Sequence, residues 1–491
     1  MTTGGEQRTT FLAHVRALAA RSAPGRPLPD GGYPLPDADL RRGSRVMPDA
    51  VWDGVRSQHA GVDVDEPTAV ALAREIGELV AGPPTEAGLR HLHDTAAEHD
   101  LLQIADAITK EMAGLTLPRD RVREVGRRLA EHGTRRNAVA LGVLLLGVSG
   151  DRRDRELLLD LGSLEDLTLY AAVALTRTQP DRERVLFDLA RRVTGWGRIH
   201  TVQRLKGTKD PQIKAWLLRE GFRNSIMDEY LAHLAATTGG LRAALAGGPV
   251  DDELLDGAGD ILTALSLGGP AEDLTDYADG PEVIDRYLTL VQQRPPTLHR
   301  VATVLELSTD AGRSGAWRAV VDEALDSPDL DVVRQAIRPA KELGIPFRDR
   351  VRARLGQHPN DGYLWQTLLD DIGDIDDVLA LAHELLPLDQ LADGPSLDVG
   401  HGYGRPEHVL DLIVGRLDAH PGKGWPLIRA ALRNPAIRNR NMAVRALDAW
   451  PKDTVPDEVV AALRRAGEQE PDPEVAGRMR DLLTTWTVST A

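Results

Sequence analysis

The sequence predicts an all-α protein, an α-solenoid of paired helices preceded by an irregular N-terminal arm. From about residue 66 onward, helical segments follow one another, separated by short turns of Gly, Pro and Asp. Many of these segments recur as pairs of similar length. Aromatic residues make up only 4% of the chain, whereas a β-sandwich or barrel would be richer in Val, Ile, Thr, Tyr and Phe.

The N-terminal region is expected to differ from the rest. Residues 8–22 have the spacing of apolar residues that indicates a helix. Residues 23–50 hold six prolines and several glycines, which favour turns over regular structure. We therefore expect a short helix, followed by an irregular arm that lies over the surface of the helical repeats.

Five helix pairs stand out in the repeat region, and the clearest begin about 30 residues apart. They are 180–195 with 196–207, 210–221 with 222–240, 315–327 with 328–344, 423–434 with 435–450, and 456–470 with 471–486. A fixed period of helix pairs indicates a solenoid, because one pair cannot bury its apolar face alone. The second helices often open with Pro or Asp and carry a β-branched residue before Arg, as at Val333-Arg334 and Ile437-Arg438. In this they resemble the HEAT-repeat family, which implies a HEAT-like fold.

A second resemblance covers residues 196–260. The blocks WGRIHTVQRL, WLLREGFRN, MDEYLA and DGAGDIL are similar to a group of bacterial helical-repeat proteins that carry the name limonene hydroxylase. This resemblance implies a shared fold. Hydroxylases that activate oxygen use haem, flavin or a non-haem iron triad, and the sequence shows no dinucleotide fingerprint and no clean spacing of two His and one carboxylate. We therefore expect no cofactor.

Composition narrows the classes of function. The chain has 491 residues, of which 42% are apolar and 27% charged, a globular balance. It contains no cysteine, which excludes disulfides, cysteine-ligated zinc, iron–sulfur clusters and thiol nucleophiles. The net charge of −16 argues against a nucleic-acid partner, and so against a helical-repeat DNA-repair glycosylase.

Neither a membrane span nor a signal peptide is expected. The longest apolar run, residues 138–148, is shorter than the roughly 18 residues that a membrane helix needs. The N-terminus lacks a basic start followed by an apolar block. We expect a cytoplasmic protein that has no membrane partner.

Breaks in the pattern divide the chain into four expected regions. Residues 1–62 form the N-terminal helix and arm, and residues 63–300 form the N-terminal helical repeats. Residues 301–398 form the middle repeats, and residues 399–491 hold a Gly-rich loop and the C-terminal HEAT-like repeats.

The helix expected over 196–206 predicts a candidate binding groove. One side of it is apolar and the other is polar. Equivalent helices stack side by side in a solenoid, so their polar sides form a continuous strip. This strip could bind a ligand or peptide, or it could be a ladder of salt bridges between repeats. The groove residues are His200, Thr201, Arg204, Arg223, Asp228 and Glu229.

Charge is segregated around the same groove. Residues 191–223 carry nine Arg or Lys against two acidic residues, and residues 251–285 carry eleven Asp or Glu and no Arg or Lys. Two patches of opposite sign can focus an electric field on a zwitterionic or peptide ligand. They can equally neutralise each other within the protein, and the sequence leaves both readings open.

Residues 368–386 contain two overlapping Asp patterns. Asp370, Asp371 and Asp374 match the DDxxD pattern with which isoprenoid synthases bind magnesium and diphosphate. Asp374, Asp376 and Asp377 match the DxDD pattern of class II terpene cyclases, in which an Asp acts as the acid. Both chemistries need clustered carboxylates. Asp is frequent enough in this chain for such patterns to arise by chance, and the alternative is a solvated acidic turn.

A Gly-rich loop interrupts the repeats at 399–409. It holds His401, Tyr403 and Arg405, and loops on a rigid scaffold often carry function. It is a candidate binding loop, or a plain connection between repeats. No metal site is expected, because the His and carboxylate residues of the chain lack the spacing of known metal motifs.

These observations favour a non-catalytic scaffold that binds a protein or peptide partner through the concave surface of the solenoid. The alternative is an enzyme on a helical-repeat scaffold that acts on a small molecule. Terpenoids are the class that the Asp patterns suggest for it, with Asp370 to Asp377 as its carboxylates.

Overall fold

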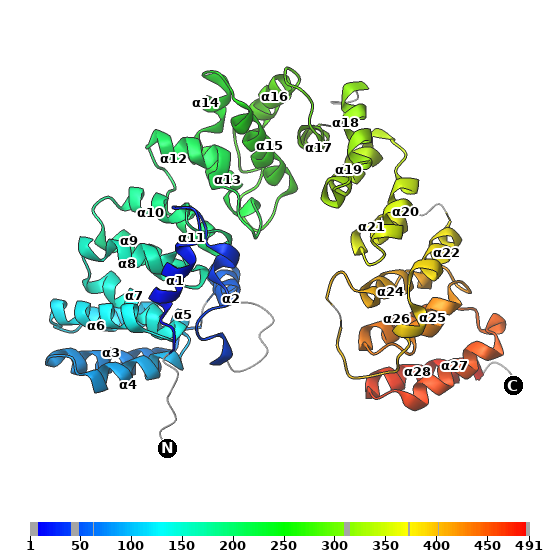
Figure 1. The fold of residues 1–491 in the computed structure, drawn as a ribbon, viewed down its shortest axis with the longest axis horizontal. Helices are drawn as coiled ribbons and strands as arrows, with labels where there is room; N and C mark the ends of the chain where they lie inside the picture. Colours follow the sequence, from blue (N-terminus) through cyan, green and yellow to red (C-terminus); the bar gives the residue numbers. More distant parts are fainter. Residues whose placement is uncertain are drawn as a thin grey trace. The chain divides into compact units, whose positions relative to one another are not determined.

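The computed structural model describes residues 8–40, 49–61, 63–308, 315–371, 374–400 and 402–487. Over these residues it contains 28 α-helices and no β-strand, apart from an isolated bridge between Asp398 and Ala436. The predicted all-α fold class is confirmed. Neighbouring helices pack in pairs, as an α-solenoid requires (Figure 1). No helix in this part of the chain combines the length and the apolar character needed to cross a membrane.

The chain forms two compact units. Unit 1 comprises Met1–Pro295 and Glu306–Ala311, and unit 2 comprises Pro296–Leu305 and Gly312–Ala491. The helices of unit 1 are α1 (Phe11–Ala19), α2 (Asp49–Val55), α3 (Glu66–Ala81), α4 (Glu86–Ala97), α5 (Leu101–Ala113), α6 (Arg119–His132), α7 (Arg136–Ser149), α8 (Arg155–Gly162), α9 (Glu165–Thr178), α10 (Arg182–Ala190), α11 (Gly195–Gln203), α12 (Pro211–Trp216), α13 (Glu229–Gly239), α14 (Leu241–Ala246), α15 (Asp252–Leu267) and α16 (Gly280–Val291).

Residues of α17 (Leu298–Leu307) belong to both units. The helices of unit 2 that follow it are α18 (Gly315–Leu325), α19 (Leu330–Leu343), α20 (Arg348–Gln357), α21 (Gly362–Asp370), α22 (Ile375–Leu385), α23 (Leu388–Leu391), α24 (Pro406–Val414), α25 (Trp425–Ala431), α26 (Ile437–Asp448), α27 (Asp457–Gln469) and α28 (Pro473–Thr487).

All five predicted helix pairs are present. They are α10 with α11, α12 with α13, α18 with α19, α25 with α26, and α27 with α28. Start signals in the sequence explain several of the boundaries. Asp210, for example, accepts hydrogen bonds from the backbone N–H groups of Gln212 (2.7 Å) and Ile213 (3.3 Å), and Pro211 follows it as the first helical residue.

The core of unit 1 lies between its first and second helices. Second helices of successive pairs contact one another in the order α7, α9, α11, α13 and α15. The apolar run noted at 138–148 lies within α7, where nearly every side chain is buried because α4, α5, α6 and α9 pack around it. Its apolar character therefore serves the core of the protein.

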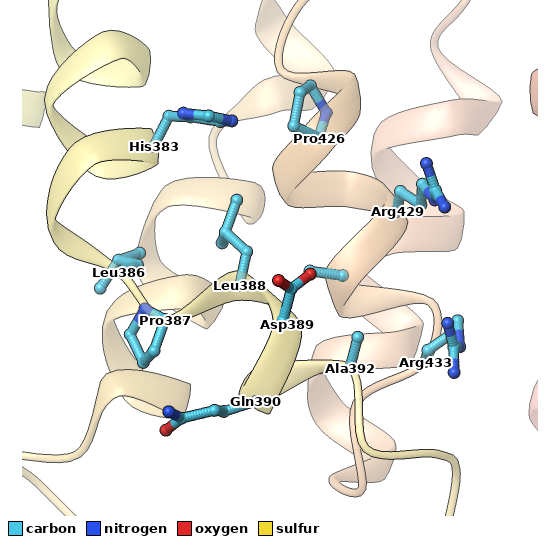
Figure 2. A pocket seen from close by; sticks show the side chains of 11 residues that line it. His383, Leu386, Pro387, Leu388, Asp389, Gln390, Ala392, Pro426, Arg429 and Arg433 are labelled. Atoms are coloured by element: carbon cyan, nitrogen blue, oxygen red, sulfur yellow. The ribbon is translucent and has the colours of Figure 1, made fainter.

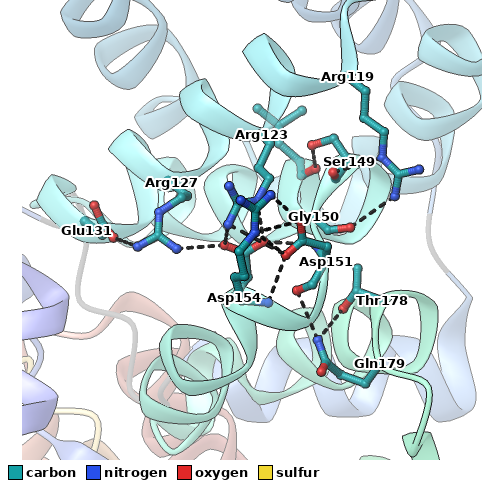
Figure 3. Close-up of polar contacts among 12 residues, drawn as sticks. Arg119, Arg123, Arg127, Glu131, Ser149, Gly150, Asp151, Asp154, Thr178 and Gln179 are labelled. Carbon is teal, nitrogen blue, oxygen red and sulfur yellow. Dashed lines mark hydrogen bonds and ion pairs between the residues drawn. The ribbon is translucent and has the colours of Figure 1, made fainter.

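A buried carboxylate joins α6 to the turn that precedes α8 (Figure 3). The Asp154 side chain is fully buried and accepts hydrogen bonds from Arg123 and Arg127, each at 2.7 Å, and from the backbone N–H of Asp151 at 3.0 Å. Burial alone would raise the pKa of Asp154, but these hydrogen bonds, that of Arg123 foremost, hold the pKa below its ordinary value. Arg119 of the same helix donates to the carbonyl of Gly150 at 3.1 Å.

The N-terminal arm lies over the repeats, as predicted. The first helix, α1, packs on α6 and α8, and the backbone N–H of Phe11 donates to the carbonyl of Gly133 at 3.1 Å. Residues 20–40 have no α-helix. Further along, α2 packs on α9 and α11, so the arm reaches the second helices of unit 1.

Candidate functional site

Two of the predicted groove residues along α11 are buried. His200 is 5% exposed and Thr201 is fully buried, and only Arg204 of the three reaches solvent. The expectation that these side chains line an open strip is therefore wrong for His200 and Thr201. Burial, and secondarily the charge of Arg204, lower the pKa of His200 to about 4, so the imidazole is neutral at pH 7.

Neighbouring helices explain this burial. Helix α11 contacts α9 and α13 in its own layer, α10 in the other layer, and α2 of the arm. The last contact is close, because a Cβ atom at Gly54 of α2 would lie 2.0 Å from the ring of Trp196. The sequence indicates a two-sided helix, but α11 has neighbours on every side.

Arg204 instead lines a pocket in unit 1. This cavity, of about 510 Å³, is bordered by α5, the C-terminal half of α7, α9, and Arg204 at the end of α11. We call it the unit 1 pocket. Its apolar wall includes Val64, Leu102, Leu144, Leu169 and Val173, and its polar wall includes Ser57, Gln103, Asp106, Thr109, Tyr170, Arg177 and Arg204.

Two arginines of the unit 1 pocket have no carboxylate partner among the residues that the structure describes. Arg177 makes no hydrogen bond or ion pair with any other residue in the described part of the chain, and Arg204 donates only to the carbonyl of His200, at 2.5 Å within its own helix. Both side chains are exposed. A guanidinium has five N–H donors, so most of their hydrogen-bonding capacity faces solvent and the cavity.

A buried ionic cluster lies behind Tyr170 on the pocket wall. The Arg136 side chain is 5% exposed and pairs with Asp53 of α2 and, at 3.0 Å, with Asp166 of α9. The Tyr33 hydroxyl donates to Asp166. The Arg136 guanidinium carbon lies 5.9 Å from the Tyr170 ring centre. Burial raises the pKa of Tyr170, and within the described residues its phenol oxygen has no hydrogen-bond partner.

The remaining groove residues serve contacts within unit 1. Arg223 pairs with Asp260. Asp228 accepts the backbone N–H of Asn224 at 2.9 Å, and burial raises its pKa. Glu229 is the first residue of α13 and is partly buried. Arg204, which the sequence analysis expects opposite Asp228 and Glu229, lines the unit 1 pocket, and neither acidic residue lines it.

The two oppositely charged segments meet. Besides Arg223 with Asp260, Arg219 pairs with Asp251 at 2.8 Å. Both pairs join the basic segment to the acidic one, so the segments neutralise each other in part. Of the two readings that the sequence left open, these contacts favour the structural one.

The Asp-rich turn is a set of solvated ion pairs. Asp370 pairs with Arg416 at 2.8 Å and Asp376 with Lys423 at 2.6 Å, and both carboxylates are exposed. Asp374 caps the start of α22 by accepting the N–H of Asp376 at 3.0 Å. Asp371 lies 3.8 Å from Arg348, and Asp377 is exposed in the first turn of α22.

The Gly-rich loop belongs to unit 2. His401 lies outside the described residues. Tyr403 is 93% exposed and stacks edge-on against His408, with ring centres 5.1 Å apart. Arg405 is exposed and directly precedes α24.

A second cavity, of about 490 Å³, lies in unit 2 among α22, α23 and α25 (Figure 2). Its lining includes the polar side chains of His383, Asp389, Arg429 and Arg433, and all four are exposed. Apolar burial supplies most of the free energy of binding, so this polar groove is the weaker candidate site.

No group of three or more His, Asp or Glu side chains that could hold a metal ion occurs among the residues that the structure describes. No family model matches the chain, and no curated protein matches it.

Proposed function

We propose that this protein is a non-catalytic binding scaffold that engages a protein or peptide partner through the unit 1 pocket. One observation carries the proposal: the pocket combines an apolar wall with Arg177 and Arg204, neither of which has a carboxylate partner in the described chain. Ligand pockets typically pair apolar lining with a few polar groups that fix orientation. The paired helices also support the proposed kinship with HEAT repeats, which present extended binding surfaces.

The partner surface that fits this pocket is apolar and acidic. The apolar wall supplies affinity by removing apolar surface from water. The two guanidinium groups supply charge-assisted hydrogen bonds, which are about twice as strong as neutral ones. The protein as a whole carries a net charge of −16, so an acidic partner would be repelled by the overall charge and attracted locally by the two arginines of the pocket.

A peptide-display selection tests this proposal. Selected peptides should be apolar and acidic, and their binding should slow amide hydrogen exchange in α5 and α9, which line the pocket. The double variant Arg177→Glu/Arg204→Glu should lose binding, because it replaces two attractive charges with repulsive ones. Arg182→Glu is the matched control, since Arg182 is an exposed arginine of α10 outside the pocket. Binding that the double variant retains, or protection that maps to other helices, would refute the proposal.

A further inference from the structure

The unit 1 pocket places two arginines at one end of neighbouring helices. Arg177 lies in the last turn of α9, and Arg204 is the C-cap residue that directly follows α11. These are the second helices of successive pairs and contact each other directly, so their C-terminal ends lie at the same side of the repeat stack. The fold therefore brings two cationic groups, separated by 26 residues of chain, to one cavity.

The charge balance of the pocket fits a single carboxylate. A planar guanidinium matches the two oxygens of a carboxylate, and two of them can hold it from different directions. Asp106 lines the same pocket, and its negative charge would oppose a doubly charged phosphate more than a singly charged carboxylate. Arg204 retains free N–H groups because only one is given to the carbonyl of His200.

The apolar wall requires that the carboxylate belongs to an apolar group. Leu102, Leu144 and Leu169 line the cavity together with Val173. An internal Asp or Glu side chain could bring its carboxylate to the arginines of this cavity of about 510 Å³, but its own stem is too short to cover the apolar wall. A C-terminal Leu, Val or Phe, by contrast, carries its apolar side chain and its carboxylate on the same carbon atom.

We infer that the unit 1 pocket binds the C-terminal residue of a peptide, with its apolar side chain against the leucines and its free carboxylate at Arg177 and Arg204. This inference rests on the proposed binding function and specifies its ligand. A free aliphatic carboxylic acid shares the same chemistry, so the test must separate the two sources.

The test uses the full chain and a library of short peptides displayed with free, randomised C-termini. Selected sequences should converge on an apolar last residue. A selected peptide, synthesised as the acid and as the C-terminal amide, is then titrated by fluorescence anisotropy. The amide cannot form the charge-assisted hydrogen bonds of the acid, so it should bind about tenfold more weakly than the acid, or weaker still. Arg177→Gln and Arg204→Gln should each lower the affinity for the peptide acid by about tenfold and leave the affinity for the peptide amide unchanged. Arg182→Gln should bind like the wild type.

The possible failures can be told apart. Equal affinity of acid and amide, with exchange protection still in α5 and α9, would overturn the C-terminal carboxylate and leave the binding scaffold standing. If decanoate, a free aliphatic carboxylic acid, binds and no peptide does, the inference that the ligand is a peptide would be overturned. Peptides that protect helices outside the pocket would overturn both this inference and the proposed function. Circular dichroism of the arginine variants checks folding, which should be preserved because both side chains are exposed.

Discussion

His200 shows how burial changes the chemistry of a single side chain. In the sequence it is a polar residue beside an arginine, but in the structure it is 5% exposed within α11. Transfer of a charged imidazolium from water into this site is unfavourable, and the nearby Arg204 adds repulsion. The side chain therefore stays neutral where exposed histidines begin to charge, and it belongs to the core behind the pocket.

We expect His200 to make the protein less stable in mild acid. Its pKa is about 4 in the folded protein and 6.5 unperturbed, so the unfolded chain binds more protons between these values and stability rises with pH there. The contribution of the neutral His200 to the free energy of unfolding is therefore complete above pH 6.5. It is lost as the pH falls toward 4, and the free energy of unfolding falls by about 3 kcal/mol over this range. Urea unfolding of the wild type and His200→Gln at several pH values checks this. Parallel pH profiles for the two proteins would contradict it.

Helix pairs in unit 1 approach each other closely where glycines face one another. Gly142 of α7 packs on α6, and a Cβ atom there would lie 2.7 Å from the backbone nitrogen of Ala130 and 2.8 Å from the carbonyl oxygen of Gly126. Backbone atoms cannot move aside as the end of a flexible side chain can. The two helices must therefore separate to accept any larger residue at position 142.

We expect Gly142→Ala to destabilise the protein by about 2 kcal/mol, because overpacking outweighs the gain in helix propensity. Gly77→Ala is the matched control. Gly77 lies inside α3, where the nearest heavy atom to an added Cβ is 3.7 Å away, so this change should stabilise by about 0.5–1 kcal/mol. Thermal unfolding of both variants measures the two effects. Equal shifts in Tm would show that the approach of α6 and α7 is not tight.

At the level of elements, the sequence predicts the helices better than their faces. The repeat period and helix-start signals such as Asp210-Pro211 identify the helix pairs. These start signals can be read from the sequence because they depend on local backbone chemistry. Which face of a helix is buried depends on distant segments. The contact of Gly54 with Trp196 joins residues far apart in the sequence, and no local pattern signals it.

The candidate site was predictable only in part. Arg204 is identified from the sequence, although with Asp228 and Glu229 as its expected neighbours. Arg177 is missed, because a lone arginine at a helix end usually interacts with the helix dipole. The feature that could have identified Arg177 is its position in the repeat, because Arg177 and Arg204 lie at the C-terminal ends of equivalent helices in successive repeats. Exact helix ends, which sequence patterns locate only within a few residues, are needed to see that match.

At the scale of the whole chain, the N-terminal arm is an integral part of unit 1. Two side chains attach it to the repeats, the buried Asp53 through its pair with Arg136 and the half-buried Tyr33 through its hydrogen bond to Asp166. It also borders the unit 1 pocket, since Ser57 lies just after α2. The proline-rich composition predicts an irregular arm, but it does not predict that the arm carries a buried ion pair.

We expect Asp53→Asn to loosen the arm. Among the described residues, the substitution leaves the buried charge of Arg136 with only Asp166 as its carboxylate partner, and breaking a buried pair costs about 3 kcal/mol. Amide hydrogen exchange should accelerate in residues 49–61, and peptide affinity should fall, because the arm forms one border of the unit 1 pocket. Asp39→Asn is the matched control, as Asp39 forms an exposed pair with Arg8 in the same arm and should change neither measurement. Faster exchange in the arm with unaltered peptide affinity would show that the arm stabilises unit 1 without shaping its pocket.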